Sequence, residues 1–285
     1  MRYGILAFAL LLAASSATQA CKMPILLGIA QQTVQSEVVV VGTVTFIERE
    51  VADTKSHPEV LDAMPYTVAI VKVETALRGV KNITHIRVGF VLRAESPDRG
   101  FEGFGGNRVT NLAETGRYVL FLQKHPVGNF YQFPSQTPPL LIADGDNREW
   151  AIAEAKLAAD AIADPMKALK LENAQDRALS ALALLMHYRQ PASRGEVDRV
   201  PLGAEENAAI LKAIADGDWT LVITAHTTLT SALQYLGIAA TDGWNYPVVP
   251  AGANAEAVYR TAFQDWLAGP GAKFRIHKSV LKPKN

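Results

Sequence analysis

Residues 36–47, SEVVVVGTVTFI, constrain the fold more than any other stretch of the chain. Consecutive valines favour a β-strand, because branched side chains pack well on a pleated surface. The unbroken apolar run predicts burial on both faces at that end, and the alternation after Gly42 predicts that one face of the other end reaches solvent. A glycine inside a strand marks a bulge or a sharp bend. A long first strand that bends midway is what a small closed β-barrel needs.

More strands are expected in the first half of the chain, at 66–77, 83–90, 116–124 and, as short pieces, 131–133 and 140–143. The glycine-containing turn at 78–82 predicts that the first two of these form a hairpin. Residues 21–35 predict a short helix or an extended arm. The polar segment 49–65 is expected to be a loop. The glycine-rich segment 95–115 is also expected to be a loop, of a length that is often functional.

After residue 145 alanine dominates and helical periodicity replaces alternation. Helices are expected at 148–170, 173–188, 205–214 and 255–267. The apolar face of the first is expected to hold Trp150, Ala153, Leu157, Ala161 and Leu169, and Pro165 is able to start a fresh turn within it. Residues 219–238 fit a strand or a helix, and 274–280 fit a short closing strand or an extended tail.

Residues 1–20 have the three parts of a secretory signal peptide. Arg2 gives the positive start, residues 5–14 are apolar, and small residues follow up to Ala20. The apolar run is too short to cross a bilayer, and we expect no membrane-spanning helix in the mature protein. The sequence therefore predicts a secreted protein, or one of the periplasm or cell envelope.

Cys21, the single cysteine of the chain, directly follows this segment. One alternative is that Cys21 carries a lipid that tethers the protein to a bacterial membrane. The other is ordinary cleavage after Ala20 or Ala17, which gives a soluble product. A lipidation signal normally has an aliphatic residue three positions before the cysteine, where this chain has Thr18, so ordinary cleavage is favoured.

Composition limits the classes of partner. The 285 residues hold 28 Lys and Arg against 28 Asp and Glu, a formal net charge of zero. Binding of nucleic acid driven by charge needs a basic face, so it is not expected. The hydrophobic content of 49% is ample for a core and suits one large or two ordinary domains.

The order of elements in the first half resembles the netrin-like family, which includes the tissue inhibitors of metalloproteinases. The resemblance is carried by Cys21 with Pro24 and by segments 36–47, 66–81, 83–88 and 112–122. It implies an OB-like five-stranded β-barrel. In the animal inhibitors the amino-terminal cysteine chelates the zinc of the target protease, which makes Cys21 a candidate binding residue here. Those inhibitors begin with Cys-x-Cys, whereas this chain has Met23 at the second position.

The sequence shows no familiar catalytic or metal-binding motif. The histidines are isolated from one another, at positions 57, 85, 125, 187, 226 and 277. No HExxH, paired Cys/His set or GxSxG element is present, so no metal site and no cofactor are expected. His187 is expected to be packed or at a helix end, and His85 and His277 to face solvent. His226 lies among hydroxyl residues, and it is the place where a catalytic site assembled only in space would be sought.

Three other local patterns have a functional and a structural interpretation. Asp144, Asp146 and Glu149 faintly resemble a calcium loop, but a helix N-cap at Asp146 or Asn147 fits better. Asn82 begins a glycosylation sequon. In the segment 242–247, DGWNYP, Trp244 and Tyr246 form either an exposed recognition patch or a loop anchored to the core by its aromatic rings.

The sequence therefore predicts an α+β protein: signal peptide 1–20, an OB-like barrel domain at 21–145 and an α-helical region at 146–285. The expected function is non-enzymatic binding of another exported or surface protein, in a form that includes protease inhibition. The alternatives are a structural envelope lipoprotein tethered through Cys21, which would then contact the membrane, and an enzyme.

Overall fold

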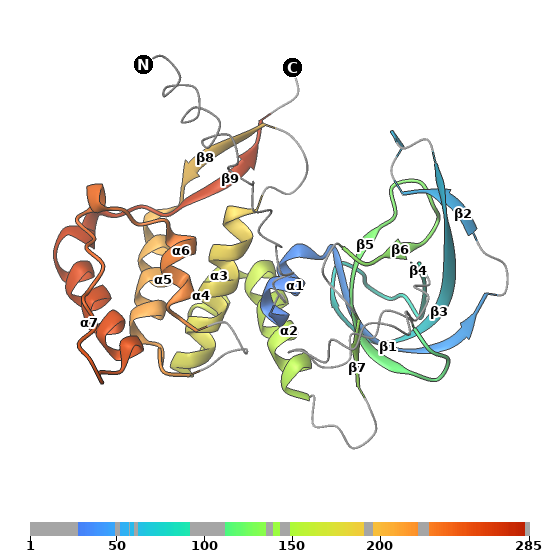
Figure 1. Ribbon diagram of the computed structural model, residues 1–285, viewed down its shortest axis with the longest axis horizontal. Helices are drawn as coiled ribbons and strands as arrows, with labels where there is room; N and C mark the ends of the chain where they lie inside the picture. Colours follow the sequence, from blue (N-terminus) through green and yellow to red (C-terminus); the bar gives the residue numbers. More distant parts are fainter. Residues whose placement is uncertain are drawn as a thin grey trace, which may run out of the picture.

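The computed structural model describes residues 28–48, 52–56, 58–59, 62–91, 112–134, 139–142, 149–190, 196–221 and 228–282. The fold is mixed α+β, as predicted, with strands in the first half and helices in the second. Figure 1 shows the curved sheet at one end of the molecule, the larger helical body at the other, and α1 and α2 between them. Among the elements that the structure describes, α1 and α2 thus lie between the two halves.

The main sheet contains β1 (Val38–Ile47), β2 (Ala52–Lys55), β3 (Ala63–Arg78), β4 (His85–Phe90), β5 (Arg117–Lys124), β6 (Tyr131–Gln132) and β7 (Leu140–Leu141). Their order is β1-β3-β4-β6-β5-β7, with β2 on β3. Because β1 also pairs with β5, strands β1, β3, β4, β6 and β5 form a ring. All the pairs are antiparallel except β4 with β6.

The valine run of β1 is buried on both of its faces, as predicted. Val38, Val40 and Val44 point into the ring, where they join a core that includes Leu120. The outward-facing Val39 and Val41 pack with residues of α1, α2 and β5. Beyond Gly42, Thr45 is exposed. The β1–β3 register shifts between Val41 and Gly42, so the predicted irregularity at the glycine is confirmed.

The prediction of a loop at 49–65 is wrong for most of its described residues. β2 lies in this segment and pairs with the first residues of β3, which begins at Ala63. Pro65 is opposite Asp53 in this pairing. The prolines and polar residues suggested a turn, but the pair lies at the margin of the sheet, where proline and charge are tolerated. The other predicted strands and the β3–β4 hairpin are confirmed, with small shifts of their ends.

The helical half contains α2 (Glu149–Ala163), α3 (Pro165–Ala168), α4 (Ala174–Arg189), α5 (Ala204–Asp216), α6 (Ser231–Leu236) and α7 (Ala255–Ala268). The short 3-10 helices η1 (Ala240–Asp242) and η2 (Pro270–Lys273) flank α7, and α1 (Ile29–Gln35) precedes β1. Pro165 starts a new helix as predicted, and the Asp164 side chain accepts a hydrogen bond from the Lys167 N–H at 3.1 Å. The ambiguous segment contains the helix α6, and residues 222–227 lie outside the described part.

The predicted apolar face of 148–170 is only partly correct: Ala161 and Leu169 are buried, but Trp150 and Ala153 are exposed and Leu157 is half-buried. Trp150 is 53% exposed, and the buried residues of α2 are alanines. Ala151 and Ala155 face the sheet ring, whereas Ala158 and Ala161 belong to the core of the helical half. Small side chains let α2 approach neighbours on both sides closely, so its burial does not follow the large apolar residues.

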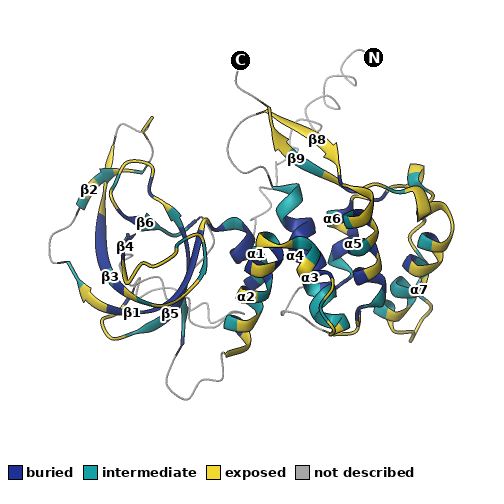
Figure 2. Ribbon diagram, turned by 180° about the vertical axis from the view of Figure 1, so that it is seen from behind, coloured by how far each residue is buried: buried dark blue, intermediate teal, exposed yellow. Residues whose placement is uncertain are grey.

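One strand pair was only half anticipated. β9 (His277–Leu281) is the expected closing strand, and it pairs antiparallel with β8 (Val197–Pro201), a strand that was not predicted. Every residue of β8 is exposed, so it lacks the alternation by which strands are recognised. Figure 1 shows this ribbon projecting from the helical body, and Figure 2 shows it coloured mainly as exposed.

Helix α1 is held at both ends by ionisable side chains. At its start, the Ala30 N–H donates to Glu154 Oε1 of α2 at 3.1 Å. At its end, Arg78 of β3 donates to the carbonyl oxygens of Thr33 and Val34 at 2.6 and 3.1 Å. These contacts satisfy backbone groups that a helix leaves unpaired at its termini. They also fix α1 between the sheet and α2.

Burial raises the pKa of Glu154 to about 7, although the Ala30 N–H partly opposes the shift. The folded protein therefore holds this proton more tightly than the unfolded chain, so stability falls as the pH rises from about 4.5 to 7. Glu154→Gln keeps an acceptor for Ala30 and removes the titration. We expect the variant to gain stability relative to the wild type between pH 4.5 and 8, by on the order of 2 kcal/mol, in urea unfolding.

Glu149→Gln is the matched control for this experiment. Glu149 lies on the same helix with a side chain that is 71% exposed, so Glu149→Gln makes the same chemical change on α2 away from the buried contact with Ala30. Equal pH dependence in the wild type and Glu154→Gln would show that Glu154 is not the group responsible.

Candidate functional site

The structure does not reach some of the residues singled out from the sequence. Cys21, His57 and His226 lie outside the described residues, as do Asp144 and Asp146. The predicted 95–115 loop is described only from its end, where Leu112 is buried in the ring core. The proposals that rest on these residues therefore stay predictions.

The described histidines occupy ordinary structural positions. His85 and His277 are exposed, and His187 lies in the last turn of α4, as predicted. Burial, with the positive charge of Arg78, lowers the pKa of His187. Burial also lowers the pKa of His125, whose Nδ1 accepts hydrogen bonds from the N–H groups of Val127 and Gly128. A ring nitrogen that accepts two such bonds keeps the imidazole neutral.

Trp244 anchors the loop at 243–253, between η1 and α7. Its side chain is 3% exposed and makes T-shaped ring contacts with Trp266 and Phe263, at centroid distances of 6.0 and 6.4 Å. Trp266 in turn donates from Nε1 to the Asp242 carbonyl at 2.9 Å, just before the loop. For Trp244 the structural interpretation of the aromatic pair is therefore correct.

Tyr246, by contrast, points away from the core. It is 64% exposed, although its ring still contacts that of Trp244 at 5.9 Å. Two residues further on, Val248 is 89% exposed, more than any other large hydrophobic residue among those described. Exposure alternates along this segment: Tyr246, Val248 and Pro250 are exposed, and Pro247 and Val249 are half-buried. We call the three exposed residues the 246–250 stripe.

The stripe is held in an extended form by its own sequence. Proline fixes φ near −65°, and the residue before a proline is biased toward extended conformations. Pro247 and Pro250 therefore restrict themselves and also Tyr246 and Val249. The segment has no regular secondary structure, and its residues are exposed or half-buried. An apolar segment that is already extended loses little conformational freedom on binding.

The ends of the loop are fixed by hydrogen bonds. Before it, Asp242 Oδ2 accepts from the Ala239 N–H at 2.9 Å. After it, Asn254 Oδ1 accepts from the Ala257 N–H at 2.9 Å and caps α7. Gly252 has φ +80°, a conformation that glycine adopts readily, and closes the turn before this cap. The stripe is thus presented from a fixed base.

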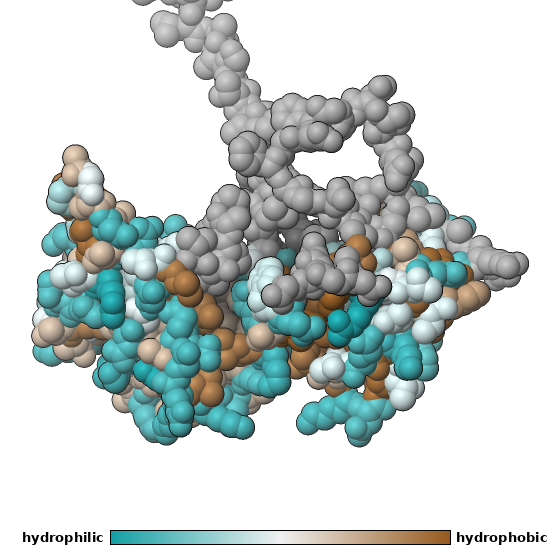
Figure 3. All heavy atoms as spheres, turned by 90° about the horizontal axis from the view of Figure 1, so that it is seen from below, coloured by the Kyte–Doolittle hydropathy of each residue, from teal (hydrophilic) through white to brown (hydrophobic). Residues whose placement is uncertain are grey.

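No known protein-family model matches the chain. A search of curated proteins also finds no similar sequence. The site therefore has to be interpreted from its own chemistry, which is that of a small apolar surface on a rigid support. Elsewhere the surface is mixed: in the face drawn in Figure 3, hydrophobic residues are interspersed among hydrophilic ones.

Two further observations concern the described residues only. No three His, Cys, Asp or Glu side chains among them come together in the manner of a metal site. None of the described helices combines the length and the hydrophobicity that crossing a membrane requires.

Glu149 begins α2, and its carboxylate lies 3.9 Å from the guanidinium of Arg117 of β5. The one described residue of the calcium-like segment therefore contacts a cationic side chain.

Sequence reasoning found part of this site. It identified the Trp244 and Tyr246 pair but left open which ring was exposed, and it overlooked Val248 and Pro250. The signal was present, because two X-Pro pairs within five residues predict an extended segment whose side chains alternate between two faces. The sequence could not show which of these two faces is turned toward the protein and which toward solvent.

Proposed function

We propose that this protein is an exported, non-enzymatic binding protein that recognises another exported or surface protein through the 246–250 stripe. The observation that carries the proposal is the 89% exposure of Val248 beside Tyr246, on a loop anchored by the buried Trp244. Exposed apolar groups gathered on one segment commonly mark interaction sites. Export is supported by the signal-like pattern at 1–20.

The ring of strands supports an OB-like five-stranded barrel as the scaffold of the first half. Five strands follow one another around the ring, β1 closes it by pairing on both edges, and β1 changes register at Gly42. A small Greek-key barrel needs this closure and bending. The proposed domains are the barrel at 21–145 and the helical region at 146–285, with α2 in contact with both.

Protease inhibition through Cys21 is a narrower form of the binding proposal, and tethering through a lipidated Cys21 is the alternative to it. The chemistry of the mature amino terminus separates them, because lipidation attaches the Cys21 sulfur to the membrane, and acylation of the α-amine also removes the group with which Cys21 would chelate a metal.

Photocrosslinking tests the stripe. With p-benzoylphenylalanine in place of Val248 in exporting cells, we expect a discrete adduct with another exported or surface protein. The adduct should be lost when Tyr246→Ser is added, because the neighbouring apolar contact is removed. Both side chains are exposed, so neither change should affect stability by more than about 0.5 kcal/mol.

The same crosslinker in place of Trp150 is the matched control. Trp150 is 53% exposed on α2 and is not part of the stripe. Identical adducts from both positions, or none from Val248, would contradict the proposal.

A further inference from the structure

A second feature of the helical half is independent of the stripe: an open groove between α5, α7 and η2, with a volume of about 380 Å³. Its floor is aliphatic and includes Leu211 and Ala215 of α5 and Leu267 of α7. Leu211 and Ala215 are 6% and 8% exposed, so the floor lies below the surface of the helices. The volume falls within the range of small-ligand sites.

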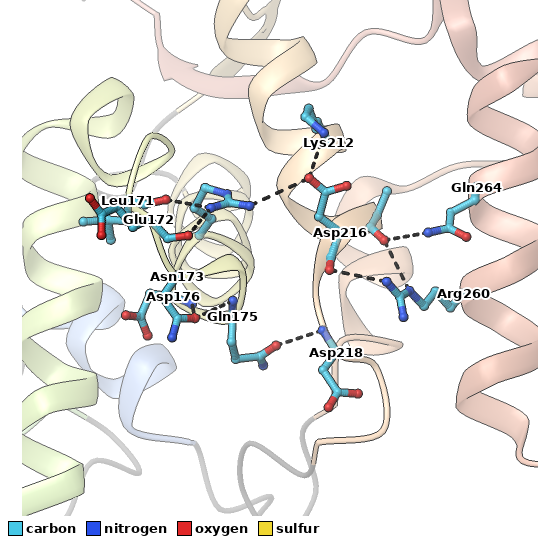
Figure 4. A network of polar contacts seen from close by, with 12 residues as sticks. Leu171, Glu172, Asn173, Gln175, Asp176, Lys212, Asp216, Asp218, Arg260 and Gln264 are labelled. Carbon is cyan, nitrogen blue, oxygen red and sulfur yellow. Dashed lines mark hydrogen bonds and ion pairs between the residues drawn. The ribbon is translucent and has the colours of Figure 1, made fainter.

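The walls of the groove are fixed by side-chain hydrogen bonds. Asn207 of α5 donates to the Phe274 carbonyl at 3.0 Å and accepts from the Ile276 N–H at 2.7 Å, which ties the segment after η2 to α5. At the other end, Gln264 of α7 donates to the Ala215 carbonyl at 2.9 Å. Figure 4 shows Gln264 and Arg260 reaching from α7 to the end of α5. The groove is therefore preformed.

The charged residues of the groove leave an excess of positive charge. Lys212 and Asp216 of α5 form an ion pair at 2.8 Å, and Arg177 of α4 approaches the same carboxylate at 3.9 Å (Figure 4). Arg275, on the wall after η2, is exposed and donates to the carbonyl of its neighbour Phe274 at 3.2 Å. The single carboxylate of the lining thus already has two cationic partners, and Arg275 stands beside the aliphatic floor.

We propose that this groove binds the carboxylate end of an aliphatic peptide chain. The floor accepts the small apolar side chains of the last residues, and Arg275 donates to the terminal carboxylate. An arginine fork suits a carboxylate geometrically. A peptide is the favoured occupant because its terminal carboxylate complements Arg275 and its last side chains complement the aliphatic floor, while the opening to solvent lets the rest of the chain leave the groove.

Calorimetry on the mature full chain tests the ligand class with defined probes. The probes are the tripeptide acetyl-Ala-Leu-Val with a free carboxylate, the same tripeptide as its amide, and octanoate. We expect submillimolar binding of the acid and about fivefold weaker binding of the amide, because the amide loses the charge-assisted bond. Octanoate carries the same carboxylate on a lipid-like chain, and we expect it to bind more weakly than the peptide acid.

Arg275→Gln tests the assigned cation, and Lys273→Gln is its matched control. Both side chains are basic and exposed within η2 or just after it, but Lys273 does not line the groove. We expect Arg275→Gln to weaken the acid about fivefold and to leave the amide nearly unchanged, with no effect from Lys273→Gln. Ala208→Trp, at an exposed position of the groove wall, should abolish binding of both peptides without unfolding the protein.

Several outcomes would overturn this assignment: no binding of any probe, equal binding of acid and amide, tighter binding of octanoate than of the peptide, or equal effects of the two charge variants. Crosslinking from Val248 should be the same in Arg275→Gln as in the wild type. The proposal for the groove and the proposal for the stripe can therefore be contradicted independently of each other.

Discussion

Replacing Gly42 by alanine should destabilise the protein by about 2–3 kcal/mol, because β1 and β3 leave no room for a β-carbon at this position. A Cβ on Gly42 would lie 2.6 Å from the Lys72 carbonyl oxygen and 2.7 Å from Cγ1 of Val71. The carbonyl belongs to the β3 backbone, so relief requires a shift of a strand rather than a rotamer change. Urea unfolding measures the loss as a lower midpoint.

Gly203→Ala is the matched control. Gly203 precedes α5 with φ −57°, and a Cβ there would have no neighbour within 4 Å among the described atoms. Gly203 is the N-cap of α5, where glycine is preferred to alanine, so the substitution should cost about 1 kcal/mol or less, well below the loss expected at Gly42. Equal effects of the two substitutions would mean that the close approach of β3 to Gly42 is not what requires glycine.

The same residue shows what sequence can predict about this fold. A valine run interrupted by a glycine predicts a strand that is buried on both faces and is irregular at the glycine. The structure shows both-sided burial and a shift in the β1–β3 register at Gly42. β8 shows the opposite case. Its residues are all exposed, and its last residue, Pro201, pairs with His277, near the other end of the helical half in sequence, so no local pattern indicates the pairing.

The prediction of the buried face of α2 is wrong at Trp150 for a different reason. Sequence reasoning places the largest apolar residues inside, and here that rule selects Trp150, which is exposed. The helix lies between two cores, and small alanine side chains let it pack closely against both of them. In the candidate site, Trp244 and Tyr246 could be picked out by type, but only the fold decides which one is buried. The groove could not be found at all, since α5, α7 and η2 form it together.

The largest loss of stability is expected from Trp219→Ala, at about 3–5 kcal/mol, the usual range for removing a large buried aromatic side chain. Trp219 is completely buried, lies 5.6 Å from the Phe263 ring between centroids, and donates from Nε1 to the Ile214 carbonyl at 2.8 Å. The substitution therefore leaves a cavity and also removes one of the two hydrogen bonds that the Ile214 carbonyl accepts, the other coming from the Gly217 N–H.

Trp150→Ala provides the contrast within the same chain. Because Trp150 is 53% exposed, Trp150→Ala should lower the free energy of unfolding by less than about 1 kcal/mol. A similar loss from both tryptophans in urea unfolding would contradict the burial that separates them.

The effect of Trp219→Ala should extend beyond the helical half. Helix α2 buries Ala155 against the sheet ring and Ala161 in the core that contains Trp219. Loosening that core removes one of the two supports of α2, and with it part of the packing over Val39 and Val41 of β1. We therefore expect faster amide hydrogen exchange in β1 of the variant as well as in α5. Unchanged exchange in β1 would mean that the two halves unfold independently and that α2 does not couple them.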